Sequence, residues 1–156
     1  MDKLFWIIPG RLAGRPGPDE EAWDLQTFQQ GSIGAILSVN DGHRCDQQEL
    51  ALLDIAYACY PLSDWVPPQP GDAEICLNIL PAACAFVRSQ LSRGRRVVVH
   101  CSGGNDRTGL CLGYFLVRYM GLAPNRALQT VRAVRPTALS AEGWEDFAHQ
   151  IWLNAR

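Results

Sequence analysis

The sequence predicts a single α/β domain whose central, mostly parallel sheet of about four to five strands is flanked by helices. Short apolar runs rich in Val, Ile and Ala alternate along the chain with longer segments that carry helix caps and helical periodicity. A length of 156 residues suits one hydrophobic core. No internal repeat, low-complexity tract or linker divides the chain, so we expect residues 1–156 to form one domain.

The expected strands are short, apolar and bounded by turn-forming residues. The first turns at Pro9-Gly10 within FWIIPGRLAG, and the second is a buried run that ends before NDGH. The last, RRVVVHC, contains three consecutive valines, which favour extended backbone. The predicted strands are 5–14, 33–39, 56–62 and 95–101.

Capping residues and periodicity predict the helices. The first follows Pro18 and is acidic at its start, and Asp46 with Glu49 forms a capping-box pattern for the second. The longest apolar segment contains Pro81, which we expect to kink the helix or divide it in two. A proline-stiffened loop, 63–71, precedes it, and Ser140 is the expected cap of the last helix. The predicted helices are 19–30, 46–55, 72–94, 108–121, 123–135 and 140–156.

Composition argues against several function classes. A net charge of -2 gives no reason to expect nucleic acid or an anionic membrane as a partner. The six cysteines form no CxxC pair and no Cys/His cluster with zinc spacing, so no metal site and no cofactor are expected. The N-terminal apolar run is too short for a signal peptide, and no segment approaches the ~18 apolar residues of a membrane span. We therefore expect a cytoplasmic protein with reduced thiols and no membrane insertion.

The stretch VVVHCSGGNDRTG, residues 97–109, carries the chemistry. It places Cys101 at the end of an apolar strand and Arg107 at the start of a helix, with two glycines between them. The Cys-x5-Arg spacing alone is weak evidence, because about 0.5 such pairs arise by chance in this composition. The glycines, however, let backbone N–H groups converge on one centre, and the helix N-terminus adds partial positive charge. The stretch is therefore suited to hold a phosphate-like anion and to favour the Cys101 thiolate, with the Arg107 fork as a clamp.

HCSGGNDRTG resembles the phosphate-binding loop HCxxGxxR[ST] of the cysteine-dependent protein tyrosine and dual-specificity phosphatases, and every motif position matches. The resemblance implies Cys101 as the nucleophile that forms a phosphocysteine, and Arg107 as the binder of phosphoryl oxygens. It implies Thr108 as a hydroxyl donor to the cysteine sulfur, and His100 as a residue that shapes the loop and is not a base. The residues implied to line the phosphate site are Ser102, Gly103, Gly104, Asn105, Asp106 and Arg107. The alternative interpretations are an inert buried thiol for Cys101 and a plain helix N-cap for Thr108.

A phosphate monoester needs its leaving oxygen protonated, and a positioned carboxyl group is suited to that. Asp64 follows a predicted strand and opens the proline-rich loop in YPLSDWVPPQPG. This segment resembles the general-acid loop of the same family, which implies Asp64 as the general acid. The alternative is an aspartate that merely starts a turn. Asp72 fits better as the N-cap of the next helix.

Two features depart from the family pattern. Asp106 places a carboxylate inside the loop where many members carry a small or neutral residue, although phosphoinositide-type branches often have Asp-Arg. We expect it to be paired structurally, because an unpaired carboxylate facing a dianion is costly. Residues 142–144, Glu-Gly-Trp, stand where the family often has a glutamine that positions water. Asp64 alone is therefore expected to serve both chemical steps. The short chain resembles the compact dual-specificity class.

Further arginines and cysteines are weaker candidates. Arg135 and the pair Arg11 and Arg15 could contact an anionic substrate at the rim of the site, but we expect solvated surface arginines. Cys45 or Cys59, near the ends of neighbouring strands, is a hypothetical partner for a reversible disulfide that protects the catalytic cysteine.

The leading hypothesis is a metal-independent phosphate monoester hydrolase that acts through a phosphocysteine. Its expected substrate is phosphotyrosine, or also phosphoserine and phosphothreonine, in a protein or peptide. An alternative within the same fold is a phosphatase for phosphoinositides or other small phosphate esters, for which Asp106 is the reason. An alternative of another class is a catalytically silent phosphate-binding module, although a pure binder has no use for a nucleophile. A rhodanese-like sulfur transferase fits the Arg-Thr pair and the upstream acid less well.

Overall fold

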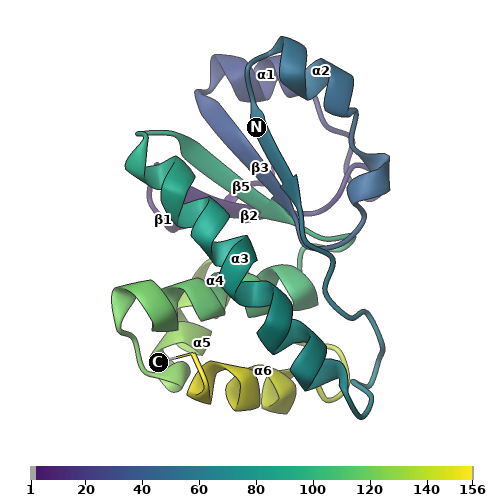
Figure 1. Cartoon of the computed structure of the whole chain (residues 1–156), viewed down its shortest axis with the longest axis vertical. Helices are drawn as coiled ribbons and strands as arrows, with labels where there is room; N and C mark the ends of the chain where they lie inside the picture. The colour runs from purple at the N-terminus through teal and green to yellow at the C-terminus, as the bar shows by residue number, and fades with distance from the viewer. Residues whose placement is uncertain (1–2, 156) are drawn as a thin grey trace.

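A computed structural model describes residues 3–155 and shows one five-stranded sheet with helices on both faces (Figure 1). The strand order is β1-β2-β5-β3-β4. Neighbouring strands are parallel except at one edge, where β1 pairs antiparallel with β2. The predicted α/β class with a mostly parallel sheet is confirmed. The strands are β1 Phe5–Ile8, β2 Leu12–Arg15, β3 Ile33–Ser38, β4 Ala56–Cys59 and β5 Arg96–His100.

The position of β5 fixes the position of the Gly-rich loop. β5 lies between β2 and β3, and the side chains of Val97, Val98 and Val99 are fully buried. The first two strands form the hairpin predicted from Pro9-Gly10, with Gly10 at a φ of 70° that glycine adopts without strain. Because parallel strands end at the same edge, the segment after His100 lies at the carboxyl edge of the sheet, where α/β proteins bind ligands.

The helices bury two apolar clusters, one on each face of the sheet. The smaller cluster joins Phe28 and Leu50 of two short helices to Ile36 and Val98 of the sheet. The larger cluster joins the opposite face to the four longer helices, which gather on that side in Figure 1. A short 3-10 helix, Gly42–Arg44, follows β3. The α-helices are α1 Leu25–Gln30, α2 Gln47–Leu52, α3 Asp72–Ser92, α4 Asp106–Met120, α5 Pro124–Val134 and α6 Trp144–Leu153.

The first helix is shorter than predicted. α1 begins at Leu25 because Asp24 is its N-cap and accepts a hydrogen bond from the backbone N–H of Thr27. The acidic segment before it is not helical. The Arg15 guanidinium holds that segment by donating to two of its backbone carbonyl oxygens, at 2.9 and 3.1 Å. The prediction of a helix from residue 19 was wrong, because these contacts between the segment and β2 are invisible in the local pattern.

Two other helices also differ from prediction. α3 runs unbroken through Pro81, which is exposed, while its buried side chains, from Cys76 to Leu91, pack in the larger cluster. The expectation that no segment approaches a membrane span was wrong, because α3 is long and apolar enough to cross a membrane; its buried stripe, however, is that of a core helix. α6 begins at Trp144 after Gly143, whose φ is 79°, and not at a Ser140 cap.

Candidate active site

The loop between β5 and α4 wraps around the sulfur of Cys101. The sulfur accepts a hydrogen bond from the backbone N–H of Gly104 at 3.3 Å and one from the Thr108 hydroxyl at 3.1 Å. Gly104 has a φ of 74°, and a Cβ there would lie 2.8 Å from the backbone nitrogen of Pro16. Only glycine fits this position, so the close approach of the β2 end to the loop explains the residue.

α4 points its N-terminus at the same sulfur. The helix has 15 residues and begins at Asp106, five residues after Cys101. Its first N–H groups and its dipole supply partial positive charge at the loop, and hydrogen bonds to a charged sulfur are stronger than those to a neutral one. Thr108 is fully buried on the first turn of α4, and its hydroxyl donates to the sulfur rather than serving as the helix cap. The arrangement is suited to hold a thiolate.

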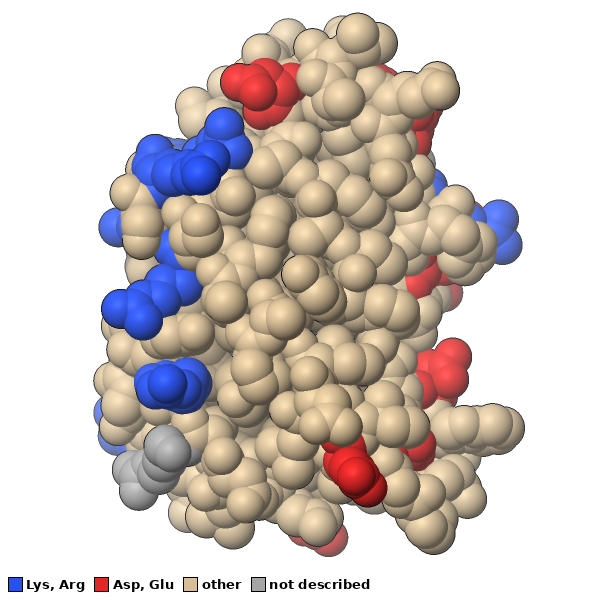
Figure 2. All heavy atoms as spheres, viewed as in Figure 1, with Lys and Arg blue, Asp and Glu red and all other residues tan. Residues whose placement is uncertain are grey.

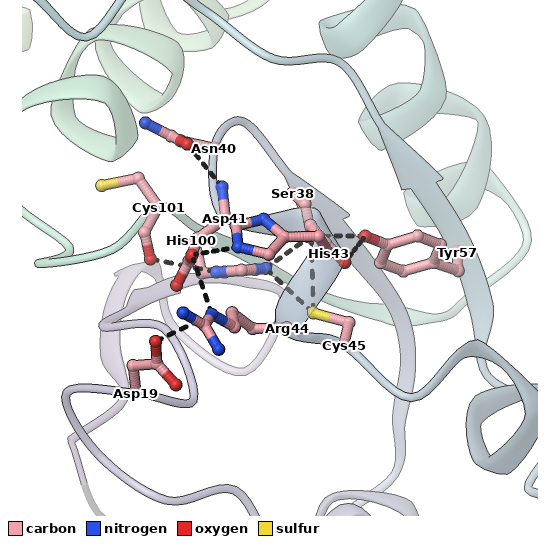
Figure 3. A network of polar contacts seen from close by, with 11 residues as sticks. Asp19, Ser38, Asn40, Asp41, His43, Arg44, Cys45, Tyr57, His100 and Cys101 are labelled. Carbon is pink, nitrogen blue, oxygen red and sulfur yellow. Dashed lines mark hydrogen bonds and ion pairs between the residues drawn. The ribbon is translucent and has the colours of Figure 1, made fainter.

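His100 supports the loop from beneath, as Figure 3 shows. Its Nδ1 lies 3.0 Å from the carbonyl oxygen of Cys101, so this nitrogen must carry the proton and donate. Its Nε2 then accepts from the Ser38 hydroxyl at 2.5 Å, and Ser38 in turn accepts from the Tyr57 hydroxyl at 2.7 Å. Burial lowers the pKa of His100 from 6.5 to about 4, with a smaller contribution from the positive charge of Arg15. A neutral imidazole with both nitrogens engaged has the geometry that a loop-shaping role requires.

Cys45, the cysteine beside His100, does not reach the Cys101 sulfur. Cys45 lies 3.4 Å from Nε2 of His100 and 3.7 Å from the Ser38 hydroxyl, on the side of the ring away from the loop interior (Figure 3). Burial raises the pKa of the Cys45 thiol, which lowers its reactivity. In Figure 3 the Cys101 sulfur points away from Cys45. The six cysteines are all free. The structure gives no support to the hypothesis that Cys45 or Cys59 forms a disulfide with Cys101.

Arg135 braces the outside of the loop. Its Nη2 donates to the carbonyl oxygen of Gly103 at 2.9 Å, and its Nε donates to the Asn105 side-chain oxygen, also at 2.9 Å. The Thr137 hydroxyl donates to that same oxygen at 2.7 Å. The guanidinium lies over the ring of Phe5, 5.2 Å from its centroid. The expectation of a solvated Arg135 was therefore wrong, because its guanidinium group donates hydrogen bonds to two residues of the loop.

The guanidinium groups of the other two candidate rim arginines lie away from the cavity beside the loop. Arg15 is buried, with 3% of its surface exposed, and its guanidinium lies over the rings of Trp23 and Phe28. Arg11 donates to the carbonyl oxygen of Leu91 at 3.0 Å, which is at the opposite end of the sheet. Neither is a rim contact. Ser102 is also fixed through its backbone, because its carbonyl oxygen accepts from the N–H of Gly17 at 2.8 Å.

Arg107 and Trp144 come together from α4 and α6. The guanidinium carbon of Arg107 lies 6.0 Å from the centroid of the Trp144 ring. Its Nε is buried and has no hydrogen-bond partner among residues 3–155, so the fork is not committed to another group of the described chain. A buried donor of this kind is costly until an acceptor such as a phosphoryl oxygen pairs with it.

Trp144 also tethers the loop that carries Asp64. Its indole N–H donates to the carbonyl oxygen of Trp65 at 3.0 Å, although the ring itself is fully buried. Asp64 is exposed, and its carboxylate makes no hydrogen bond with the described residues. Asp72 is not the N-cap of α3, which is Gly71. Its carboxylate instead accepts from the N–H of Gln69 at 2.6 Å, in the same loop.

Asp106 is paired, as expected, but with backbone rather than with an arginine. Its Oδ1 accepts a hydrogen bond from the N–H of Ala141 at 3.3 Å. The N–H of Leu139 donates to the carbonyl oxygen of Asn105 at 3.2 Å, one residue earlier. These two bonds tie the start of α4 to the segment between α5 and α6. The carboxylate at this helix N-terminus is also favourably placed against the helix dipole.

An open cavity of about 420 Å³ adjoins the loop. Gly103, Asn105 and Arg135 form its wall on the loop side, and Glu20 and Glu21 face it from the segment after β2. The described residues contain no group of three or more His, Cys, Asp or Glu side chains that could hold a metal ion.

A family model matches residues 19–152, and it describes the catalytic domain of dual specificity phosphatases. The chain belongs to the dual-specificity phosphatase family. Both the sequence resemblance and the fold prediction are confirmed by this match. The matched range contains the whole loop from His100 to Thr108 and also Asp64.

Individual relatives are distant. Dual specificity phosphatase 28 of Mus musculus is 32% identical over 73 residues, which are 47% of this chain and 45% of that protein. A protein of Invertebrate iridescent virus 3 that is named as a tyrosine phosphatase is 27% identical over 146 residues, 90% of this chain and 57% of that one. The chain therefore spans about half the length of the curated relatives it matches.

Solved structures of dual-specificity and tyrosine phosphatases share the fold. The crystal structure of human DUSP28 superposes with a TM-score of 0.75 at 18% identity, covering 99% of this chain and 95% of that one. The crystal structure of Tk-PTP in its active form gives a TM-score of 0.76 at 20% identity and covers 97% of each chain. These similarities establish the architecture of the domain.

Proposed function

We propose that this chain hydrolyses phosphate monoesters through a phosphocysteine on Cys101. One observation carries the proposal: the Cys101 sulfur sits at the N-terminus of α4 with two hydrogen-bond donors directed at it. A sulfur held in this way is suited to be a nucleophile and a leaving group. Arg107 follows in the first turn of α4, and its buried Nε–H has no hydrogen-bond acceptor among residues 3–155. The family of the chain supports cysteine-dependent phosphatase chemistry.

Two steps complete the proposed reaction. The Cys101 thiolate attacks phosphorus, the bond to the leaving oxygen breaks, and Asp64 gives that oxygen its proton. Water then attacks the phosphocysteine, Asp64 takes a proton from the water, and the phosphorus–sulfur bond breaks to release phosphate and the thiolate. The Thr108 hydroxyl, 3.1 Å from the sulfur, stabilises the departing thiolate. The loop N–H groups and the Arg107 fork hold the equatorial oxygens in both steps.

The cavity beside the loop supports phosphotyrosine in proteins, with phosphoserine and phosphothreonine as further substrates. Glu20 and Glu21 line the cavity together with Lys3 and Arg135, so two acidic and two basic side chains contribute to its lining. The charge of Arg135, on the loop side, is already engaged by loop acceptors. The lining therefore has no excess of positive charge for a second phosphate group, which favours a singly phosphorylated side chain over a polyphosphorylated inositol.

A small-molecule phosphatase is the second candidate. A relative from Arabidopsis thaliana, 30% identical over 78 residues, is named as a phosphatidylglycerophosphate phosphatase, and the match covers 23% of its length. That substrate is a lipid phosphate monoester, which the same loop chemistry would process. A non-catalytic phosphate-binding module is the third candidate, and it predicts phosphate binding without turnover.

Hydrolysis of p-nitrophenyl phosphate in the presence of EDTA tests the reaction class. We expect turnover that persists in EDTA and is abolished by Cys101→Ser, with inorganic phosphate still bound by the variant. A requirement for added metal, or activity in that variant, contradicts the proposal. A panel of phosphotyrosine, phosphoserine and phosphothreonine peptides beside phosphatidylinositol phosphates then separates the substrate classes. Preference for the lipid panel favours the second candidate.

A further inference from the structure

Six arginines line the end of the sheet opposite the catalytic loop. β5 starts at Arg96 and runs toward Cys101, so its first residue is at the far end of the domain from the active site. Both α3 and α4 end on this side, and Figure 2 shows most of the visible Lys and Arg side chains gathered along one edge. Acidic side chains lie mainly on the opposite edge of that view. We call this surface the arginine edge; its residues are Arg11, Arg88, Arg93, Arg95, Arg96 and Arg118.

Contacts at the ends of the helices and strands show that these arginines are neighbours. The guanidinium groups of Arg88 and Arg118 lie over the same Tyr119 ring, at 4.7 and 5.5 Å from its centroid. At the other end of the edge, a Cβ on Gly10 would lie 3.9 Å from the Arg96 guanidinium. The neighbour of that glycine, Arg11, donates to a carbonyl oxygen at the end of α3. The edge is therefore continuous from the β1–β2 hairpin to the end of α4.

The positive charge of the edge is not neutralised within the chain. The ion pairs that residues 3–155 form within 4.0 Å involve Arg44, Arg132 and His43, and none involves an arginine of the edge. Asp54 precedes β4 at the same end of the sheet, but two strands from β5, which is about 10 Å. The net charge of -2 therefore hides a strong separation of charge across the molecule.

Helix stability alone does not account for the cluster. A cation near a helix C-terminus stabilises the helix dipole, and this explains Arg118 in the last turn of α4 and Arg11, which donates to the carbonyl oxygen of Leu91 at the end of α3. Arg88 lies before the last turn of α3, Arg95 donates to a side-chain oxygen, and Arg96 starts β5, so the dipole does not account for these three. Gathering like charges costs free energy unless an opposite charge is bound.

Several of the guanidinium forks are held before any partner arrives. Arg96 lies over the Trp6 ring at 5.8 Å, and Arg95 donates to the Gln90 side-chain oxygen at 2.7 Å. Held forks lose less side-chain entropy when they pair bidentately with planar carboxylates. A fluid anionic lipid surface attracts positive charge whatever the orientation of the side chains. Guanidinium groups held in fixed orientations therefore favour a polypeptide with ordered carboxylates as the partner.

We propose that the arginine edge binds an acidic polypeptide segment rich in Asp and Glu. Binding there leaves the catalytic loop, at the other end of the sheet, open to substrate. The edge would thus place the domain beside an acidic partner protein without blocking its site. This surface is separate from the phosphate site, so the proposal does not depend on the proposed reaction.

Fluorescence anisotropy with a fluorescein-labelled oligoglutamate peptide tests the proposal. We expect binding at about 50 mM NaCl that weakens at about 300 mM, because salt screens exposed charges. The double substitution Arg93→Gln with Arg96→Gln should weaken binding by about tenfold, whereas Arg44→Gln with Arg132→Gln, which removes the same charge elsewhere, should change it by less than about twofold. Equal losses in both double variants overturn the proposal, and so does the absence of binding at low salt.

Two further measurements keep the proposal testable on the unaltered chain. Amide NMR shifts of the wild type upon peptide addition should change at residues 88–96 and 118, and changes confined to other surfaces contradict it. Vesicles containing phosphatidylserine and a single-stranded oligonucleotide serve as competing anions. The assignment to a polypeptide is overturned if the vesicle or the oligonucleotide binds more tightly than the peptide and if the double variant Arg93→Gln with Arg96→Gln loses that binding. Both double variants should hydrolyse p-nitrophenyl phosphate at the rate of the wild type.

Discussion

The buried His100 gives a quantitative prediction about stability and pH. Burial lowers the pKa of this imidazole to about 4 in the folded chain, while 6.5 is its ordinary value in an unfolded chain. Between these two values the unfolded chain binds a proton that the folded chain does not. The free energy of unfolding must therefore fall as the pH falls through this window, by up to about 1.4 kcal/mol per pH unit. The separation of about 2.5 units gives a total of about 3 kcal/mol by pH 4, and no contribution from His100 above about pH 7.

Denaturant unfolding of the wild type and of His100→Asn over this pH range measures the effect. Carboxylates titrate in both proteins, so the difference between the two curves isolates the imidazole. We expect the wild type to lose about 3 kcal/mol relative to the variant between about pH 7 and pH 4. The hydrogen bonds from Ser38 and to Cys101 are lost in the variant at every pH and shift the whole difference curve without changing its slope. A difference that stays flat across this range refutes the description of His100 as a buried, neutral support of the loop.

Three further substitutions test the proposed chemistry and the tether of the acid loop. Asp64→Asn should lower kcat for phenyl phosphate by about 100-fold or more but much less for p-nitrophenyl phosphate, whose leaving group needs no proton; equal effects on both esters place the general acid elsewhere. Thr108→Ala should slow breakdown of the phosphocysteine by about tenfold or more, because a hydrogen bond to a charged acceptor is worth about 1.5–3 kcal/mol. Rapid-quench kinetics should then show a larger burst of p-nitrophenol. If only the first step becomes slower, Thr108 does not stabilise the departing thiolate. Trp144→Phe removes the hydrogen bond to the Trp65 carbonyl oxygen and also leaves a cavity at a fully buried position, so it should lower the free energy of unfolding by about 2 kcal/mol or more; an unchanged thermal midpoint contradicts the tether.

Local sequence signals predict where the loop at the centre of the candidate site lies in the fold. Three consecutive valines predict the strand, the two glycines predict the tight loop, and the alternation of elements places that loop at the carboxyl edge of the sheet. Asp46 does cap α2, as the capping-box pattern predicts, by accepting from the Glu49 N–H. These features depend on residues close together in the chain, where sequence patterns carry direct physical meaning.

The support around the loop comes from distant parts of the chain and could not be predicted. Arg135 lies about 30 positions from the loop residues it holds, and Trp144 meets a loop 79 positions away. Ser38 reaches His100 across 62 positions. None of these pairings leaves a periodic or capping signal. Arg135 and Arg15 also show why surface exposure cannot be assumed for an arginine, since rings and carbonyl oxygens in the fold can surround its stem and fork.

Direct detection of the covalent intermediate tests the central claim most sharply. The protein is mixed with p-nitrophenyl phosphate, quenched within milliseconds under conditions that preserve the phosphorus–sulfur bond, digested and mapped by mass spectrometry. We predict one phosphoryl group on the peptide that contains Cys101, formed at the rate of the p-nitrophenol burst and absent in Cys101→Ser. Turnover without any phosphorylated Cys101 peptide, or a phosphoryl group on another residue, would contradict the account.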